Sequence, residues 1–322
     1  MSTNAQPVRR TRDVLVGVDG SSGSANAIRY ATAEAARSGG AVDVVHVVPD
    51  VAPVSGFYPV PPDQLMEAGA AALEASLATV EHDEPDEQHA RVVLRPHVRR
   101  GHVVATLAEL GRRSRVVVVG SDRRPVSMRL LTGNVSTGVS ARSAVPAVSV
   151  PDTWSPERST GVVLAGVKHP DHAEAVLAEA FEVARQRRSR LVVLHAWRLP
   201  IAYDDLLVAD AGTLQDWAAR AERELEEVVA PWRASHPDVE VEVRCVHDQA
   251  AHALVLASEE ADELVVVRRS HGVPAAAHLG STARSVLLYA HCPVRVVPAT
   301  PVPMELDLEL ESAGAPLARA GS

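Results

Sequence analysis

The sequence has few aromatic residues and almost no lysine. Aromatic side chains make up 3% of the 322 residues, and Lys168 is the only lysine. The core must therefore be built from Val, Ala and Leu, which suits buried strands covered by closely packed helices. The formal net charge is −9 and no basic face emerges. This argues against general binding to DNA or RNA, whose phosphates attract clustered positive charge.

Cysteines and long apolar runs are also scarce. Cys245 and Cys292 are too few and too far apart for a disulfide framework or a zinc site, and they favour buried thiols. No apolar run approaches the roughly 18 residues of a membrane span. The N-terminal segment MSTNAQPVRRTRD lacks the apolar core of a signal peptide. We therefore expect a cytoplasmic protein with no membrane partner.

What the sequence does contain is an internal repeat. Gly17 aligns with Gly166 and His46 with His195, in both cases 149 residues apart. Further on, Gly133 aligns with Gly280, 147 residues apart. Register kept over this length predicts two copies of one domain. We place copy one at residues 12–150 and copy two at residues 160–298, joined by the polar linker 151–159 and followed by a disordered tail at 299–322.

The two copies share an alternation of short Val-rich runs and Ala-rich helical segments. Strands are expected near 13–19, 42–48, 91–98, 115–121 and 147–150, and again near 161–167, 190–196, 239–246, 262–268 and 294–297. Segments 24–38 and 172–187 have helical length. This alternation predicts right-handed crossovers. The fold class is therefore α/β: two flavodoxin-like or Rossmann-like domains, each a five-stranded parallel doubly wound sheet with helices on both faces.

In such sheets a ligand binds beyond the carboxyl ends of the strands, where the strand order reverses. In this topology that point lies between the first and fourth strands. Asp19 ends the first strand of copy one, and its carboxylate can accept hydrogen bonds from an adenine amine or a ribose hydroxyl. Gly120 ends the fourth strand and lets a ligand approach the backbone. Gly133 and Asn134 open the next helix, whose free N–H groups attract phosphates.

These residues resemble the nucleotide loop of universal stress protein domains. The family spaces glycines as Gly, two residues, Gly, nine residues, Gly and Ser/Thr; this chain keeps Gly120 and Gly133, with Arg123 at the second glycine and Asn134 at Ser/Thr. The resemblance covers both copies, in a tandem form. It implies ATP or a related adenine nucleotide in copy one, with no catalytic residue and no metal. Asp19 would face the base or ribose, Val47 would pack on the base, and Gly120, Gly133, Asn134 and Arg123 would contact phosphates.

Copy two departs further from the family pattern. Lys168 stands at the aspartate position and reverses its charge, and Arg268 replaces the first glycine; only Gly280-Ser281 persists. We therefore expect a degenerate nucleotide site in copy two. The alternative interpretation is a nucleotide-independent stress or interaction scaffold in which both sites are degenerate.

Enzyme chemistry finds little support. The stretch DGSSGS superficially resembles the pyrophosphate-holding loop of ATP pyrophosphatases, but Asn26 follows where a second acidic residue would stand. A strand end and a helix capped by Ser22 or Ser24 explain it better. Slow ATP hydrolysis would need a metal carboxylate, and Asp122 is the only obvious acid in the loop. No G-x-S-x-G elbow follows a strand, and His169 and His172 lack a third metal ligand.

Each copy ends in an apolar strand, AVSV from Ala147 and VRVV from Val294. In the expected strand order this final strand lies at the sheet edge, and an exposed apolar edge needs a partner. The resemblance implies pairing through such strands. The two copies can satisfy each other as an intramolecular pseudo-dimer. A further homodimer stays open, and the sequence identifies no protein partner.

Overall fold

The computed structural model describes residues 11–50, 61–81, 91–121, 135–198, 211–268 and 279–298. In copy one these residues form β1 (Val14–Val18), α1 (Ser22–Ser38), β2 (Val42–Val48), α2 (Pro62–Glu81), β3 (Leu94–Arg100), α3 (Val103–Leu110), η2 (Gly111–Arg113), β4 (Val116–Ser121), α5 (Val135–Arg142) and β5 (Ala147–Pro151). In copy two they form β6 (Val162–Val167), η3 (Pro170–His172), α6 (Glu174–Arg187), β7 (Arg190–Trp197), α7 (Ala211–Ser235), β8 (Val241–His247), α8 (Ala250–Ala257), η4 (Ser258–Glu260), β9 (Glu263–Val267), α9 (Ser281–Tyr289) and β10 (Val294–Val297).

The predicted strands are all present, and most begin and end within one or two residues of the expected positions. The exception is β3, which begins at Leu94 rather than near residue 91. Pro151 belongs to β5 rather than to the linker, and it pairs with Ser121. The Val-rich runs were reliable because strands buried on both faces need apolar side chains at successive positions. The expected tail 299–322 lies outside the described residues.

The ten strands in the described residues join in one sheet of order β3-β2-β1-β4-β5-β10-β9-β6-β7-β8. Within each copy the paired strands run parallel and helices cover both faces, which confirms the predicted fold class. In copy one β1 pairs with β2 on one side and β4 on the other. The strand order therefore reverses between β1 and β4, where the ligand edge was expected.

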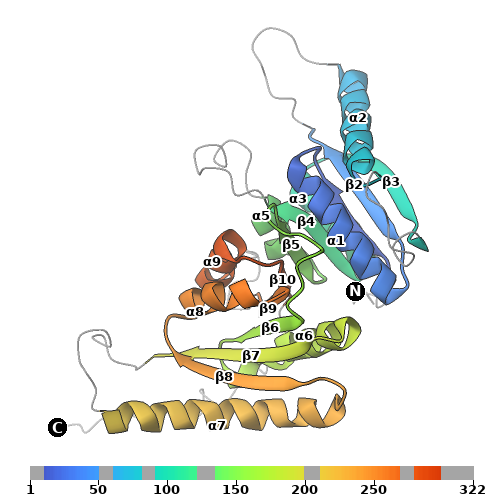
Figure 1. The fold of residues 1–322 in the computed structure, drawn as a ribbon. Helices are drawn as coiled ribbons and strands as arrows, with labels where there is room; N and C mark the ends of the chain where they lie inside the picture. The colour runs from blue at the N-terminus through green and yellow to red at the C-terminus, as the bar shows by residue number, and fades with distance from the viewer. Residues whose placement is uncertain are drawn as a thin grey trace, which may run out of the picture.

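The two copies meet where β5 pairs antiparallel with β10 (Figure 1). The strand orders of the copies are mirror images about this pair, so a pseudo-twofold axis passes between the two strands. Val148 pairs with Arg295, its equivalent 147 residues later in the repeat. The position nearest the axis is thus apolar in one copy and charged in the other.

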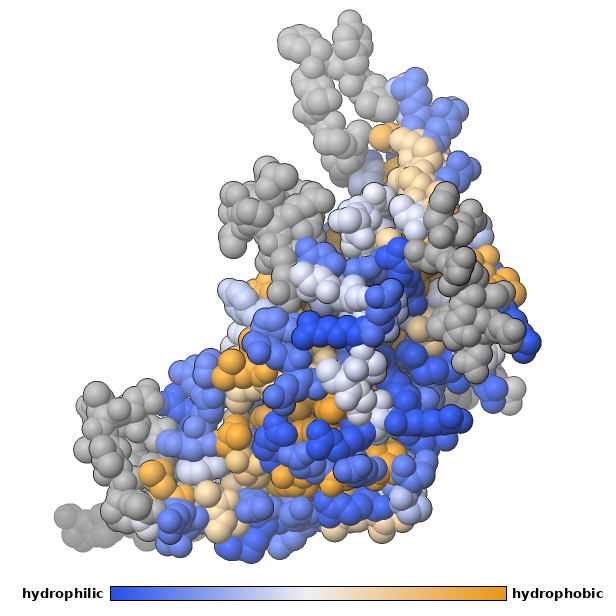
Figure 2. Space-filling model, in the orientation of Figure 1, coloured by the Kyte–Doolittle hydropathy of each residue, from blue (hydrophilic) through white to orange (hydrophobic). Residues whose placement is uncertain are grey.

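Four apolar clusters fill the spaces between the sheet and the helices. On one face α1 and α2 cover copy one, and α6 and α7 cover copy two. On the other face α3 and α5 lie over copy one, and α8 and α9 lie over copy two. Ala141 of α5 belongs to the cluster of copy two, so the core continues across the boundary. Hydrophilic side chains cover most of the face shown in Figure 2.

A cluster of buried charges joins the copies beside this boundary. Arg295 is fully buried and donates to Glu263 of its own copy and to Glu34 and Tyr30 on α1. The Tyr30 hydroxyl donates to Glu263 Oε2 at 2.5 Å, and Arg187 donates to both of these side chains. Each charge therefore has an opposite charge within hydrogen-bonding distance, as burial requires.

The linker between the copies is fastened at both ends. Near its start, the Asn26 side-chain amide donates to the carbonyl oxygens of Asp152 and Trp154, both at 2.9 Å. Near its end, the Asp262 carboxylate accepts hydrogen bonds from Ser159, Thr160 and Gly161. These contacts restrain the linker at both ends. Among the described residues, no helix is long and apolar enough to cross a membrane.

Candidate functional site

Two of the expected site residues lie together at the carboxyl edge of the copy-one sheet. Asp19 directly follows β1, and Gly120 lies near the end of β4. The register Gly17 to Val119 places the two strand ends side by side. Both residues contact the start of α1, Asp19 through Ser21 and Ser24, and Gly120 against Gly23. The local sequence DGSSGS thus builds the edge of the site by turning the chain from strand to helix.

Asp19 is positioned by hydrogen bonds to a single carboxylate oxygen. Its Oδ1 accepts the Ser21 N–H and the Ser24 hydroxyl, both at 3.0 Å, and the Ser24 oxygen accepts the Asp19 N–H at 3.0 Å. No hydrogen bond from a described residue reaches Oδ2. Asp19 itself is exposed. One oxygen therefore anchors the carboxylate while the other is available to a ligand.

Asp19 is ionised at neutral pH. Partial desolvation of the carboxyl group opposes ionisation, but hydrogen bonds from Ser21 and Ser24 and the neighbouring His46 ring outweigh it and lower the pKa of Asp19 below its ordinary value. The start of α1 adds a positive helix dipole beside the carboxylate. The group at this edge is therefore a hydrogen-bond acceptor and not a proton donor.

The serine residues do not act as predicted. The N-cap of α1 is Ser21, without a side-chain capping bond, and the Ser24 hydroxyl turns back to Asp19. The predicted capping by Ser22 or Ser24 is wrong. Asp19 accepts a hydrogen bond from the Ser21 N–H, so an acidic residue ahead of the helix satisfies a backbone donor at the helix start, as an N-cap side chain does.

Gly120 has a packing role that the sequence did not reveal. A Cβ added at Gly120 would lie 2.8 Å from the Gly23 carbonyl oxygen and 3.0 Å from its carbonyl carbon. These are backbone atoms, which cannot move aside as a flexible side chain can. The close approach between the end of β4 and the start of α1 thus requires glycine before any ligand is considered.

Val47 lies in the core, and His46 lies beside the edge where the ligand is expected. The Val47 side chain is 6% exposed and belongs to the apolar cluster under α3. The neighbouring His46 Nδ1 donates to the Val18 carbonyl oxygen at 2.9 Å. In copy two His195 Nδ1 makes the same contact with Val167, also at 2.9 Å. The repeated histidine therefore ties the ends of the first two strands together in both copies.

The remaining predicted phosphate contacts, Arg123, Gly133 and Asn134, lie outside the described residues, as does Asp122. The described residues include only the edge of the predicted site that is expected to face the base. Its members come from β1, β2, β4 and the start of α1. Sequence reasoning missed Gly23 and Ser24 as parts of this edge, although the short G-S pair at a strand-to-helix turn is a signal for close approach.

Copy two presents a different edge at the equivalent place. Lys168 follows β6 as Asp19 follows β1, so the charge at this position is reversed. Burial, Lys168 and His195 lower the pKa of the adjacent His169. The register Gly166 to Val266 places Val267 at the position of Gly120, which corrects the expected assignment of Arg268 by one residue. The Arg268 guanidinium instead crosses to copy one.

Arg268 donates through Nη1 to the carbonyl oxygens of Ala141 and Ser143, at 2.7 and 3.0 Å. These carbonyls lie at the C-terminal end of α5, where backbone acceptors lack helical partners. Arg268 therefore supports the contact between the copies. Gly280 is retained as the N-cap of α9.

The described residues offer no arrangement for metal-assisted or thiol chemistry. Among them no group of three or more His, Cys, Asp or Glu side chains could hold a metal ion. Burial raises the pKa of the Cys245 thiol to about 11 and also raises that of Cys292, which disfavours the reactive thiolates. Asn26, noted above beside the DGSSGS stretch, is occupied in holding the linker.

Comparison with known proteins identifies the family. The model of the universal stress protein family matches residues 10–151 and again residues 160–298. A universal stress protein of Mycobacterium tuberculosis is 32% identical over 298 residues, which cover 88% of this chain and 95% of that protein. Another from the same organism is 30% identical over 301 residues, covering 89% and 97%.

Solved structures share the two-domain fold. The crystal structure of a universal stress protein from Archaeoglobus fulgidus aligns with a TM-score of 0.66 at 19% identity, covering 91% of this chain and 98% of that one. A functionally unknown protein from Pseudomonas aeruginosa aligns with a TM-score of 0.58 at 13% identity, covering 89% and 92%. At these identities the likeness concerns the fold alone.

Proposed function

Because the chain belongs to the universal stress protein family, we propose that copy one binds ATP or a related adenine nucleotide in a cytoplasmic stress response, without catalysing a reaction on it. The observation that carries this proposal is Asp19. It is ionised, anchored through Oδ1 and open at Oδ2, and it stands where the strand order reverses. A fixed acceptor at this point suits an adenine amine or a ribose hydroxyl.

The rest of the proposed site extends from this anchor. In this proposal Val47, the next-to-last residue of β2, packs on the apolar face of the base. Gly120 and Gly133, with Asn134 and Arg123, contact the phosphates. The proposal limits nucleotide to copy one because Lys168 and Val267 replace an acceptor and a small residue at the equivalent edge of copy two.

A second candidate function is a scaffold that needs no nucleotide. It is favoured by the packing of Gly120 against Gly23 and by the burial of Val47, since both residues have structural reasons to be present. In this version the chain acts through its surfaces, as an intramolecular pair of domains with a homodimer or another protein as partner.

Equilibrium binding of labelled ATP, ADP, AMP and cyclic AMP to the full chain separates the two functions. Asp19→Asn keeps an acceptor at Oδ1 but removes the charge, and Asp19→Ala removes both. We expect Asp19→Ala to weaken binding about tenfold or more, the value of one lost charged hydrogen bond. Asp171→Ala, in the first loop of copy two, is the matched control and should bind as the wild type does. No saturable binding by the wild type would favour the scaffold instead.

A further inference from the structure

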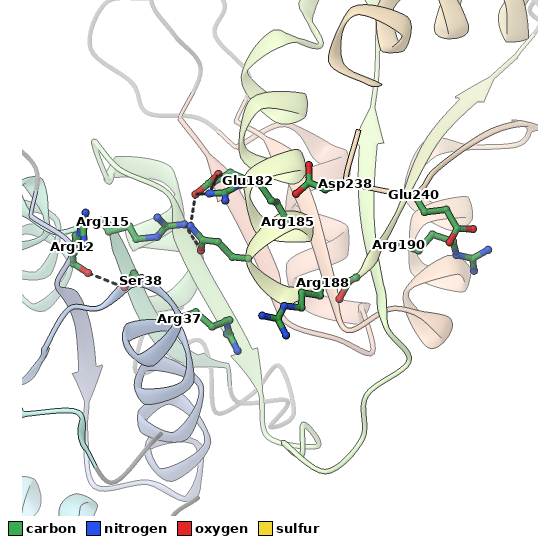
Figure 3. A pocket seen from close by; sticks show the side chains of 12 residues that line it. Arg12, Arg37, Ser38, Arg115, Glu182, Arg185, Arg188, Arg190, Asp238 and Glu240 are labelled. Atoms are coloured by element: carbon green, nitrogen blue, oxygen red, sulfur yellow. Dashed lines mark hydrogen bonds and ion pairs between the residues drawn. The ribbon is translucent and has the colours of Figure 1, made fainter. Parts of the chain in front are cut away.

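A polar cleft of about 860 Å³ opens between the two copies. Its copy-one wall lies at the end of the copy-one strands opposite Asp19, because Arg115 precedes β4. Its copy-two wall includes Arg190, the first residue of β7. Copy one and copy two each contribute three arginines (Figure 3): Arg12, Arg37 and Arg115 on one side, and Arg185, Arg188 and Arg190 on the other.

Arginines outnumber the acidic residues in the lining of this cleft. Six arginines face three carboxylates, those of Glu182, Asp238 and Glu240. The C-terminal ends of α1 and α6 also point here, and each carries roughly half a unit of negative charge. Glu34 and Glu242 also form ion pairs with arginines of the lining, and counting each as one negative charge leaves the cleft close to neutral. The case for an anion site therefore depends on the arginines that have no partner among the described residues.

The arginines divide into occupied and available groups. Arg185 forms a fork with Glu182, Arg190 pairs with Glu242 at 2.9 Å, and Arg115 donates to Gln186 at 2.9 Å. Arg37 uses one terminal nitrogen for Glu34. By contrast, the guanidinium groups of Arg12 and Arg188 make no hydrogen bond or ion pair with any residue that the structure describes. Donors are thus available on both sides of the cleft.

Arg188 has a backbone conformation that is sterically unfavourable for a residue other than glycine. Arg188 is the C-cap of α6 and has φ 53° and ψ 39°, in the left-handed region. In the described part of the chain it is the one residue other than glycine with a positive φ. Its equivalent in copy one, 149 residues earlier, is Gly39 with φ 70° and ψ 30°. Copy two therefore places an arginine where glycine meets the backbone requirement without strain, which indicates a use for the guanidinium.

We propose that this cleft binds a small free anion carrying two or more phosphate groups, held by Arg12 and Arg37 of copy one and Arg188 of copy two. Guanidinium groups present planar pairs of donors that match phosphate oxygens. A ligand with one phosphate would engage one side only, whereas two phosphates can engage both copies. The site is separate from the proposed nucleotide site, so either can fail without the other.

Titration of the full chain with inorganic diphosphate at low salt tests the proposal, with orthophosphate as the shorter comparison. Arg188→Gly removes the guanidinium and supplies the residue found at Gly39, so the fold is expected to be at least as stable by urea unfolding. We expect diphosphate to bind about tenfold more weakly to this variant, the value of one charged contact. Arg220→Gln, an exposed arginine of α7 outside the cleft, is the control and should bind as the wild type does.

The helix start proposed for phosphates in copy one could also attract diphosphate. Binding at the cleft is therefore measured as the difference in diphosphate binding between the wild type and Arg188→Gly. Asp19→Asn should leave this difference unchanged. The proposal is overturned if the wild type shows no saturable diphosphate binding, if Arg188→Gly binds as tightly as the wild type, or if orthophosphate binds as tightly as diphosphate.

Discussion

At the scale of single residues, buried carboxylates make the stability of the chain depend on pH. Burial opposes ionisation of Glu34, but Arg295, Arg37 and Arg187 outweigh it and lower its pKa. Burial is likewise outweighed at Glu263 by Arg187 and Arg295, so its pKa is also lowered. A carboxylate whose pKa is lower in the folded state stabilises that state above its unfolded pKa, about 4.3 for Glu, and loses this contribution as the pH falls below it.

The free energy of unfolding should therefore decline steeply below about pH 4.3. Urea unfolding from pH 7 to pH 3 measures this. The double variant Glu34→Gln, Glu263→Gln should be less stable at pH 7, by about 3–5 kcal/mol, because Arg295 loses its buried partners. Its stability should also fall less steeply with acid. Parallel pH curves for the variant and the wild type would show that other groups carry the acid sensitivity.

The locations of residues at the edge of the predicted site could be foreseen only for residues that directly follow a predicted strand. Asp19 and Lys168 each follow the first strand of a copy, and the repeat alone placed them correctly. The buried partners of Arg295 could not be predicted, because Tyr30, Glu34 and Glu263 are brought together by packing between the copies. Nothing in their spacing along the chain indicates this contact.

At the scale of secondary structure elements, the contact between β4 and α1 depends on Gly120, which packs against the Gly23 backbone. In Gly120→Ala the new methyl group would meet the Gly23 backbone, so the strand end and helix start must separate. We expect a loss of about 1–3 kcal/mol in the free energy of unfolding, as for other overpacked sites. The midpoint of urea unfolding measures it.

Gly138→Ala is the control for this substitution, because its methyl group would meet the movable Val104 side chain and a helical alanine gains propensity. If Gly120→Ala costs no more stability than Gly138→Ala but abolishes ATP binding, Gly120 serves the ligand rather than the packing.

The elements themselves were largely predictable, and their contacts were not. Val-rich runs gave the strands, since parallel strands buried on both faces repeat apolar residues without alternation. The serine cap was predicted wrongly because the Ser24 hydroxyl has a stronger local partner in Asp19 than in the helix N–H groups. The equivalence of Val267 and Gly120 came only from the register of β9 with β6.

At the scale of the whole molecule, the pairing of β5 with β10 predicts how the copies behave when separated. Residues 1–155 and 156–322, produced as two proteins, would each expose an apolar edge strand and should self-associate. When mixed they should form a one-to-one complex, because Glu34 and Tyr30 of copy one complete the hydrogen bonds of Arg295. Light scattering after size-exclusion chromatography measures both states. Two halves that remain monomers, alone and mixed, would contradict this prediction.

The pairing of Val148 with Arg295 has a consequence for how this chain can change over time. In a dimer of identical subunits, a residue on the twofold axis meets itself, so an arginine there would face a second arginine in a buried place. Because the two domains are fused in one chain, the two equivalent positions can mutate independently of each other. One substitution then alters one side of the axis only. The chain can thus hold one buried arginine, Arg295, beside the pseudo-twofold axis, whereas a symmetric dimer of the same shape would have to bury two.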